Sequence, residues 1–233
     1  MGQFSMEIYN PPGSLLSGNQ HSAILATPIT ANAQFGGLAS KLTGGSSNEA
    51  SVSSADGSAF LTNALRSTKN VMISAALLSQ ALTDRSSLAS KKAEIDAITN
   101  AQSFKEVNAH QVGLESNLKI LSDRKDLTAD LTASYQAGSA EQKRIIGLAV
   151  ANLAIGVFRN VKLAAQAPTM VKGVSSNPQL MGRIGEFKQA STLLAIQGKG
   201  LGTIGTALPK LMTAIKVKAP VQSEATEPQP IAL

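Results

Sequence analysis

Apolar side chains concentrate in one stretch of the chain, residues 139–167, which reads SAEQKRIIGLAVANLAIGVFRNVKLAAQA. From Ile145 to Phe158 no residue is charged, and Asn152 is the one strongly polar side chain. A helix with apolar residues on every face is either buried on all sides or surrounded by lipid. The uncharged part would rise only about 21 Å, which is shorter than a bilayer core. The pattern therefore predicts a buried helix at the centre of the fold.

Capping residues and apolar positions at three- to four-residue spacing place the other helices. Ser139 and Gln142 have the spacing of a capping box, so the central helix should begin there. The same criteria predict helices over residues 58–82, 88–99, 103–122, 127–137 and 178–197. A last helix should end near residue 217, and Pro209 either lies in its first turn or kinks a longer helix. No stretch alternates in the way that a strand requires. We therefore expect an all-α fold, a single-domain bundle of six or seven helices around the central helix, about 139–167.

Two interruptions are expected in the second half of the chain. Pro168 should end the central helix, because proline lacks the N–H group that a helix interior needs. Gly198, Gly200, Gly202 and Gly205 lie between the last two predicted helices. They predict either a flexible connection or a close crossing of two helices.

Both ends of the chain lack the helical pattern. Residues 1–33 predict a disordered leader with a degraded signal-peptide-like segment, because Ala31-Asn32-Ala33 fits the small-x-small rule for cleavage, although no Lys or Arg precedes it. Residues 34–57 are rich in Gly and Ser and predict a linker. Residues 58–218 would form the helical domain. Residues 219–233 contain three prolines and predict a disordered tail.

The net charge of +6 is distributed unevenly. Residues 34–138 hold ten basic and ten acidic residues, whereas residues 139–218 hold eleven basic residues against Glu141 and Glu186. Such a bias favours an acidic partner, or it is a solvated basic face. The candidates for binding an anionic lipid or membrane surface are Lys162, Lys172, Arg183, Lys188, Lys199 and Lys210.

The sequence lacks the residue combinations that several common catalytic and metal sites require. There is no cysteine, which excludes zinc–thiolate sites, iron–sulfur clusters and thiol catalysis. Downstream of the leader His110 is the only histidine, so one chain cannot build a Ser-His-Asp triad or a two-histidine metal site. The glycine run around Lys199 lacks the Lys-Ser/Thr step of a phosphate loop. We expect no catalytic residues, no metal and no cofactor.

Three segments carry a resemblance. They are QFGGLASKLTGG after the cleavage-like ANA, then LLSQALTDRSSLASKKAEIDAI, and finally ALPKLMTAIKVK. In this order they resemble a group of uncharacterised exported all-helical proteins of Gram-negative bacteria, over residues 34–218. The motifs are compositional rather than catalytic. The resemblance implies a periplasmic or secreted setting and no particular activity.

These observations lead to one functional expectation and two alternatives. We expect a non-enzymatic exported helical protein that binds a lipid, an anionic membrane surface or a protein partner. One alternative is a membrane-inserting or pore-forming protein, in which residues 145–158 would leave the core. The other is an enzyme that uses only carboxylates and lysines. Nucleic acid is a disfavoured partner, because Phe158 and Phe187 are the only aromatic residues in the basic half. The sequence leaves the ligand and the oligomeric state open.

Overall fold

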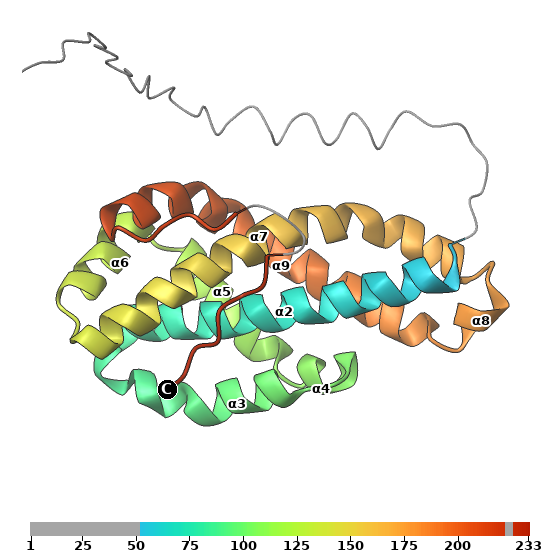
Figure 1. Cartoon of the computed structure of the whole chain (residues 1–233), viewed down its shortest axis with the longest axis horizontal. Coiled ribbons are helices and arrows are strands. Elements are labelled where there is room, and N and C mark those ends of the chain that lie inside the picture. The colour runs from blue at the N-terminus through green and yellow to red at the C-terminus, as the bar shows by residue number, and fades with distance from the viewer. Residues whose placement is uncertain (1–51, 222–225) are drawn as a thin grey trace, which may run out of the picture. The chain divides into compact units, whose positions relative to one another are not determined.

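Every regular element in the described part of the chain, residues 52–221 and 226–233, is a helix (Figure 1). These residues are described by a computed structural model and fall within one unit, Glu49–Leu233. The elements are α2 (Ser54–Thr83), the 3₁₀ helix η1 (Arg85–Lys91), α3 (Lys92–Asn100), α4 (Phe104–Asn108), α5 (Gln111–Ser122), α6 (Leu127–Gln136), α7 (Ala140–Val174), α8 (Pro178–Met181) and α9 (Ile184–Ala214). Six of these eight α-helices have seven residues or more, which confirms the predicted all-α bundle.

The helix α7 lies at the centre of the bundle, as the apolar pattern predicts. It packs against α2 and α9, the two other long helices. Its first turn carries the predicted capping box: Ser139 Oγ accepts from the N–H of Gln142 (3.2 Å), and Gln142 Oε1 accepts from the N–H of Ser139 (2.9 Å). Ile146 and Leu153 on α7 have no exposed surface. The sequence therefore identified both the start and the burial of the organising helix.

By length and composition α7 could also cross a membrane. Its most apolar window is 61% buried inside the bundle. The core helix of a bundle and a membrane-spanning helix can have the same length and composition. Length and composition therefore do not distinguish between these two roles for α7. The membrane-inserting alternative therefore stays a prediction.

The sequence predicted that the central helix ends at Pro168, and this was wrong. The helix continues to Val174. The glycine run likewise does not separate two helices, because α9 passes through it and through Pro209. Both prolines are exposed, so each lacks its N–H on the solvent side of its helix. Other residues of the same two helices, such as Ala167 and Leu201, are buried in the core. Tertiary packing thus outweighs the local cost of proline and glycine.

At Gly200 the glycine run serves a close helix crossing, one of the two expected possibilities. A Cβ atom there would lie 2.8 Å from Cβ of Leu118 on α5. At Gly202 nothing lies within 4 Å of such an atom. Only part of the run is therefore explained by packing.

Two further predicted boundaries differ from the structure. The helix α2 begins at Ser54 rather than at residue 58, because Ser53 Oγ accepts from the N–H of Asp56 (3.1 Å) and caps the helix. The helix predicted over residues 103–122 is broken at Ala109 and His110 into α4 and α5. The predicted leader 1–33 and the predicted linker up to residue 51 lie outside the described residues.

Polar side chains cross the core between the three long helices. Gln197 Nε2 on α9 donates to Thr68 Oγ1 on α2 (2.9 Å), and Asn160 Nδ2 on α7 donates to Gln197 Oε1 (3.4 Å). Asn70 Nδ2 on α2 donates to the main-chain oxygen of Asn152 on α7 (2.7 Å). All five side chains are buried. These bonds fix the register of α2, α7 and α9, because a shifted helix would leave a buried polar group unpaired.

Candidate functional site

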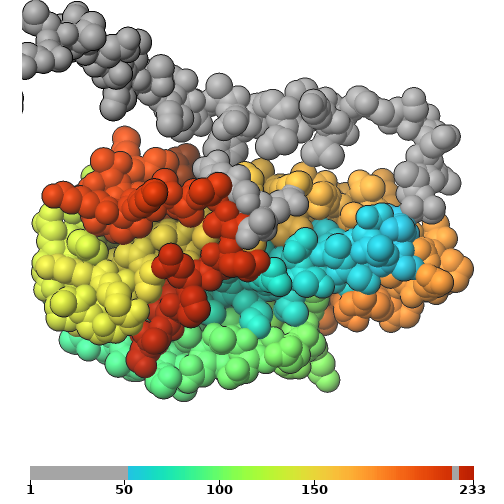
Figure 2. Space-filling model, viewed as in Figure 1, coloured from blue at the N-terminus to red at the C-terminus, as the bar shows by residue number. Residues whose placement is uncertain are grey.

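The last eight residues of the chain, 226–233, lie against α2 and α7; we call them the tail segment. In Figures 1 and 2 the tail segment is the dark-red end of the chain, which crosses the front of α7 and α2. It has no helix or strand, as expected for the predicted tail 219–233. It nevertheless makes specific hydrogen bonds to the bundle, which differs from the expected disorder. We call the surface beneath it the α2–α7 face.

Asn152 on α7 holds the middle of the tail segment by its main chain. Asn152 Nδ2 donates to the main-chain oxygen of Gln229 (2.7 Å), and the N–H of Gln229 donates to Asn152 Oδ1 (2.8 Å). The amide therefore pairs with both main-chain groups of one residue, as a neighbouring β-strand would. Asn152 is buried, whereas Gln229 is exposed. This contact therefore recognises the main chain of Gln229 and does not involve the Gln229 side chain.

Two arginines of α7 bond main-chain oxygens on either side of this contact. Arg144 Nη2 donates to the oxygen of Ala232 (2.7 Å), and Arg159 Nη2 donates to the oxygen of Thr226 (2.7 Å). On α7 the three contact residues are about 12 Å and 10 Å apart along the axis. The bonded residues of the tail segment follow at three-residue intervals, which span about 9 to 10 Å each in an extended chain. The two spacings match, so α7 presents a ladder for a segment that runs antiparallel to it.

Proline and apolar residues of the tail segment suit this ladder. Pro228 and Pro230 lack N–H groups and flank Gln229, whose N–H is the one used. A three-residue period is that of a polyproline II helix, which proline favours. Ile231 and Leu233 pack against the hydrophobic core. The bundle thus holds the tail segment in two ways, by hydrogen bonds to its backbone and by apolar contacts with Ile231 and Leu233.

Glu227 is the one acidic residue of the tail segment, and it faces two arginines. Its Oε1 lies 2.7 Å from Arg66 Nη1 on α2 and 3.6 Å from Arg159 Nη2 on α7. The side chain of Arg159 is only 7% exposed, against 48% for Arg66 and 56% for Glu227. The exposed pair contributes little on its own. The buried guanidinium is different, because a charge taken out of water requires polar or charged partners.

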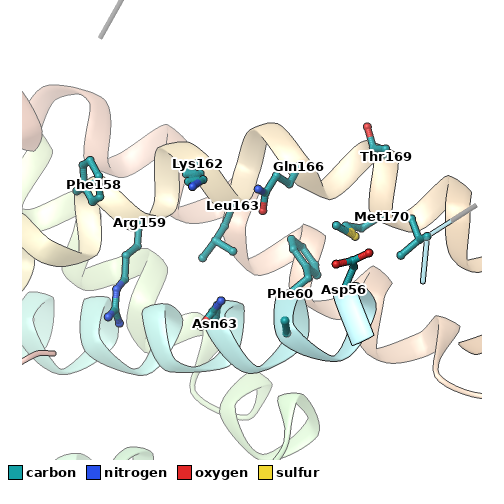
Figure 3. Close-up of a pocket in the computed structure, with 12 residues that line it drawn as sticks. Asp56, Phe60, Asn63, Phe158, Arg159, Lys162, Leu163, Gln166, Thr169 and Met170 are labelled. Atoms are coloured by element: carbon teal, nitrogen blue, oxygen red, sulfur yellow. The ribbon is translucent and has the colours of Figure 1, made fainter. Parts of the chain in front are cut away.

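A pocket of about 450 Å³ continues the α2–α7 face beyond Arg159 (Figure 3). Its apolar lining includes Phe60 from α2 and Leu163 and Met170 from α7. In Figure 3 Arg159 and Leu163 reach from α7 towards α2. The pocket therefore offers an apolar floor next to the basic end of the ladder.

Few acid–base groups are found among the described residues that line this pocket. Asp56 is the one carboxylate among them, and it accepts from Ser53 Oγ (2.6 Å) at the cap of α2. None of these described lining residues is a histidine. Within residues 52–221 and 226–233, no group of three or more His, Asp or Glu side chains is placed to hold a metal ion. The absence of catalytic residues, metals and cofactors stays a prediction for the whole chain.

The six basic residues singled out in the sequence do not form one cluster. Lys162 lines the α2–α7 pocket, and Lys172 is exposed further along α7. Arg183 pairs with Glu186 (2.9 Å) and donates to Ser58 Oγ (3.2 Å). The remaining three, Lys188, Lys199 and Lys210, lie on α9.

Lys188, Lys199 and Lys210 form a row along α9. They recur every eleven residues, which returns to nearly the same side of an α-helix and separates them by about 16 Å each. All three are exposed, and within the described residues none of them has an ion pair. The structure therefore places three of the six candidates on one surface.

Sequence reasoning missed the ladder and the residues that line it. Its one visible signal is Asn152, the only strongly polar side chain in the uncharged stretch 145–158 of α7. Arg144 and Arg159 are the basic residues on either side of that stretch, and nothing local indicates that they bond the far end of the chain. Contacts between residues so distant in sequence leave no local pattern.

Comparison of the chain with protein-family models, with curated proteins and with solved structures found no match. The resemblance to exported helical proteins of Gram-negative bacteria therefore stays a prediction.

Proposed function

We propose that this protein is a non-enzymatic binding protein whose α2–α7 face takes an extended segment of a protein partner. One observation carries the proposal: Asn152 pairs with both main-chain groups of Gln229, at 2.7 and 2.8 Å. A contact of this kind accepts any extended segment, because it does not depend on the side chain bound. The ladder residues Arg144 and Arg159 add two more main-chain contacts.

The occupant of the face in this structure is the chain's own tail segment. A segment held beside its site by a short linker acts at about millimolar effective concentration. A partner must therefore compete with the tail segment, and a fair test must first release it. The predicted periplasmic or secreted location would bring the face into contact with partners outside the cytoplasm.

We expect replacement of Gln229 by proline to release the tail segment without altering the bundle, because Gln229 is exposed. The substitution removes the N–H that bonds Asn152 Oδ1 and puts a ring carbon in its place. Gln229→Ala is the matched control, because it keeps the N–H. The chain has no cysteine, so a dye on an introduced Ala232→Cys reports the docking of the tail segment by its fluorescence anisotropy. We expect low anisotropy in the Gln229→Pro chain and high anisotropy in the control.

A labelled peptide with the sequence of residues 226–233 then tests binding in trans. It should bind saturably to the full-length Gln229→Pro chain and more weakly to the Gln229→Ala chain, whose own tail segment still competes. Asn152→Asp in the Gln229→Pro chain should abolish binding, because a carboxylate cannot donate to a main-chain oxygen. A released tail segment with no peptide binding would reject the proposal.

The lysine row on α9 supports a second candidate function, attachment to an anionic membrane surface. Each lysine near such a surface contributes about 1 kcal/mol, and salt screens the attraction. We expect the chain to sediment with phosphatidylglycerol vesicles at low salt and to be released at moderate salt. Replacing Lys188, Lys199 and Lys210 by glutamine should remove this binding, whereas the same change at Lys105, Lys119 and Lys125 should not. Equal loss in both triple variants would show that net charge, and not the row, is responsible.

A further inference from the structure

The partner segment can be described more closely, on the assumption that the proposed function holds. The first feature that defines it is the position of Glu227 between two arginines. Arg66 lies 2.7 Å and Arg159 3.6 Å from the same carboxylate oxygen. The guanidinium of Arg159 is always charged and almost fully buried, so the α2–α7 face has a fixed positive charge at this point. An acidic side chain in the bound segment meets that charge.

The second feature is the residue that follows the acid. In the tail segment it is Pro228, and the ladder uses no N–H at that position. Proline therefore sacrifices no hydrogen bond there, and it restricts the unbound segment to extended conformations. The same holds for Pro230. An acidic residue followed by Pro-x-Pro satisfies the ladder at the lowest conformational cost.

The third feature is the pocket beyond Arg159. A segment that continues the three-residue spacing places its next inward-facing residue about 9 Å beyond the Thr226 position. That distance corresponds to about six residues of α7 beyond Arg159, which is level with Ala165 and lies between the lining residues Leu163 and Met170. In this chain residue 223 is a serine, and residues 222–225 include no large apolar residue. A leucine or phenylalanine at this place in a bound segment would fill the pocket with an apolar side chain. Residues 222–225 of this chain have no such side chain.

From these three features we infer that the partner carries a large apolar residue, then three residues later the ladder contact, then an acidic residue and Pro-x-Pro. The apolar residue gives the partner its advantage over the tail segment. A second copy of this chain has the same serine at residue 223 and gains nothing over the tail segment already in place. A different protein is therefore the occupant that the α2–α7 face fits.

Synthetic peptides of residues 222–233 test this inference on the full-length Gln229→Pro chain. The probes are the unchanged peptide, a Ser223→Leu peptide and a Glu227→Gln peptide. We expect the Ser223→Leu peptide to bind about tenfold tighter or more, as burial of one leucine implies. We expect the Glu227→Gln peptide to bind about fivefold more weakly, and this loss to shrink when the exposed Arg66 is changed to Gln.

Two controls connect these effects to the site. Met170→Ser shortens the pocket lining at a partly exposed position and should remove the gain from Ser223→Leu while leaving the unchanged peptide's affinity as it was. Sedimentation of the chain without peptide shows whether a second copy binds, because a dimer would sediment faster than the single chain. If all three peptides bind with equal affinity, the inference is wrong and the proposed function stands. If none binds to a chain whose tail segment is released, the proposed function itself fails.

Discussion

A Cβ atom placed on Gly156 would lie 2.6 Å from Cγ2 of Val71, so α7 and α2 meet at a point where a glycine is required. The same atom would lie 3.3 Å from Nδ2 of Asn70, the amide that donates to the oxygen of Asn152. The close contact therefore lets α2 bond the very residue that holds the tail segment. The absence of a side chain at Gly156 therefore affects both the packing of α2 on α7 and the α2–α7 face.

Gly156→Ala should lower the free energy of unfolding by about 1 to 3 kcal/mol, the usual cost of overpacking a core. Gly202→Ala is the matched control, because nothing lies within 4 Å of its added Cβ. The control should stabilise α9 by about 0.5 to 1 kcal/mol through helix propensity. Urea denaturation followed by circular dichroism measures both. Equal changes in the two variants would show that α2 and α7 do not touch at Gly156.

Truncation on α7 should depend on which side of the helix is changed. Leu153 has no exposed surface, and Leu153→Ala should cost about 2 to 5 kcal/mol. Leu148 is only partly buried, so Leu148→Ala should cost clearly less. The two variants remove the same atoms from the same helix. A similar loss of unfolding free energy in both would mean that α7 is buried on every side.

The comparison of these two leucines shows how far the sequence could predict the fold. Residues around Leu148 and Leu153 are equally apolar, so the pattern identified the central helix but could not say which side remains partly open. Pro168 marked a helix end by its local chemistry, and burial of Ala167 on the packed face overrode it. Local rules predict an element well where packing agrees with them.

The contacts of the α2–α7 face with the tail segment were less predictable from the sequence, for a physical reason. The sequence of residues 226–233 contains two prolines and a glutamate, which alone are typical of a disordered tail. Its order comes from Asn152 and Arg159, which lie far away in the chain and use main-chain groups that are present in every residue. Recognition of a backbone leaves no signature in the sequence of the segment recognised.

The buried polar bonds between α2 and α9 should behave as a unit. Thr68→Val removes the acceptor of Gln197 Nε2 and should cost about 1 to 3 kcal/mol, because a buried donor is left unpaired. Gln197→Leu in the same chain should recover part of that loss, which a double-mutant cycle measures. Ser74 is the control, because its buried Oγ has no hydrogen-bond partner among the residues that the structure describes. Ser74→Ala should therefore be neutral or stabilising. A cost equal to that of Thr68→Val would contradict the hydrogen-bond assignment.

Acid should weaken the start of α4 through Glu106. The N–H of Gln102 donates to Glu106 Oε2 (2.8 Å) and Ser103 Oγ donates to Glu106 Oε1 (2.9 Å); these bonds lower the pKa of Glu106, with a smaller contribution from the charge of Lys69. Because the pKa is lower in the folded than in the unfolded chain, the carboxylate contributes stability above the unfolded value, about 4.3. That contribution is lost as the pH falls through the folded pKa.

Glu106→Gln should thus reduce the denaturation midpoint at pH 7, and its difference from the parent chain should shrink as the pH falls below the unfolded pKa. Ser103→Ala should weaken the chain at both pH values, since Ser103 Oγ also caps α4 by accepting from the N–H of Glu106 (3.3 Å). A constant difference between Glu106→Gln and the parent chain from pH 7 to pH 3 would show that the carboxylate's charge does not stabilise this turn.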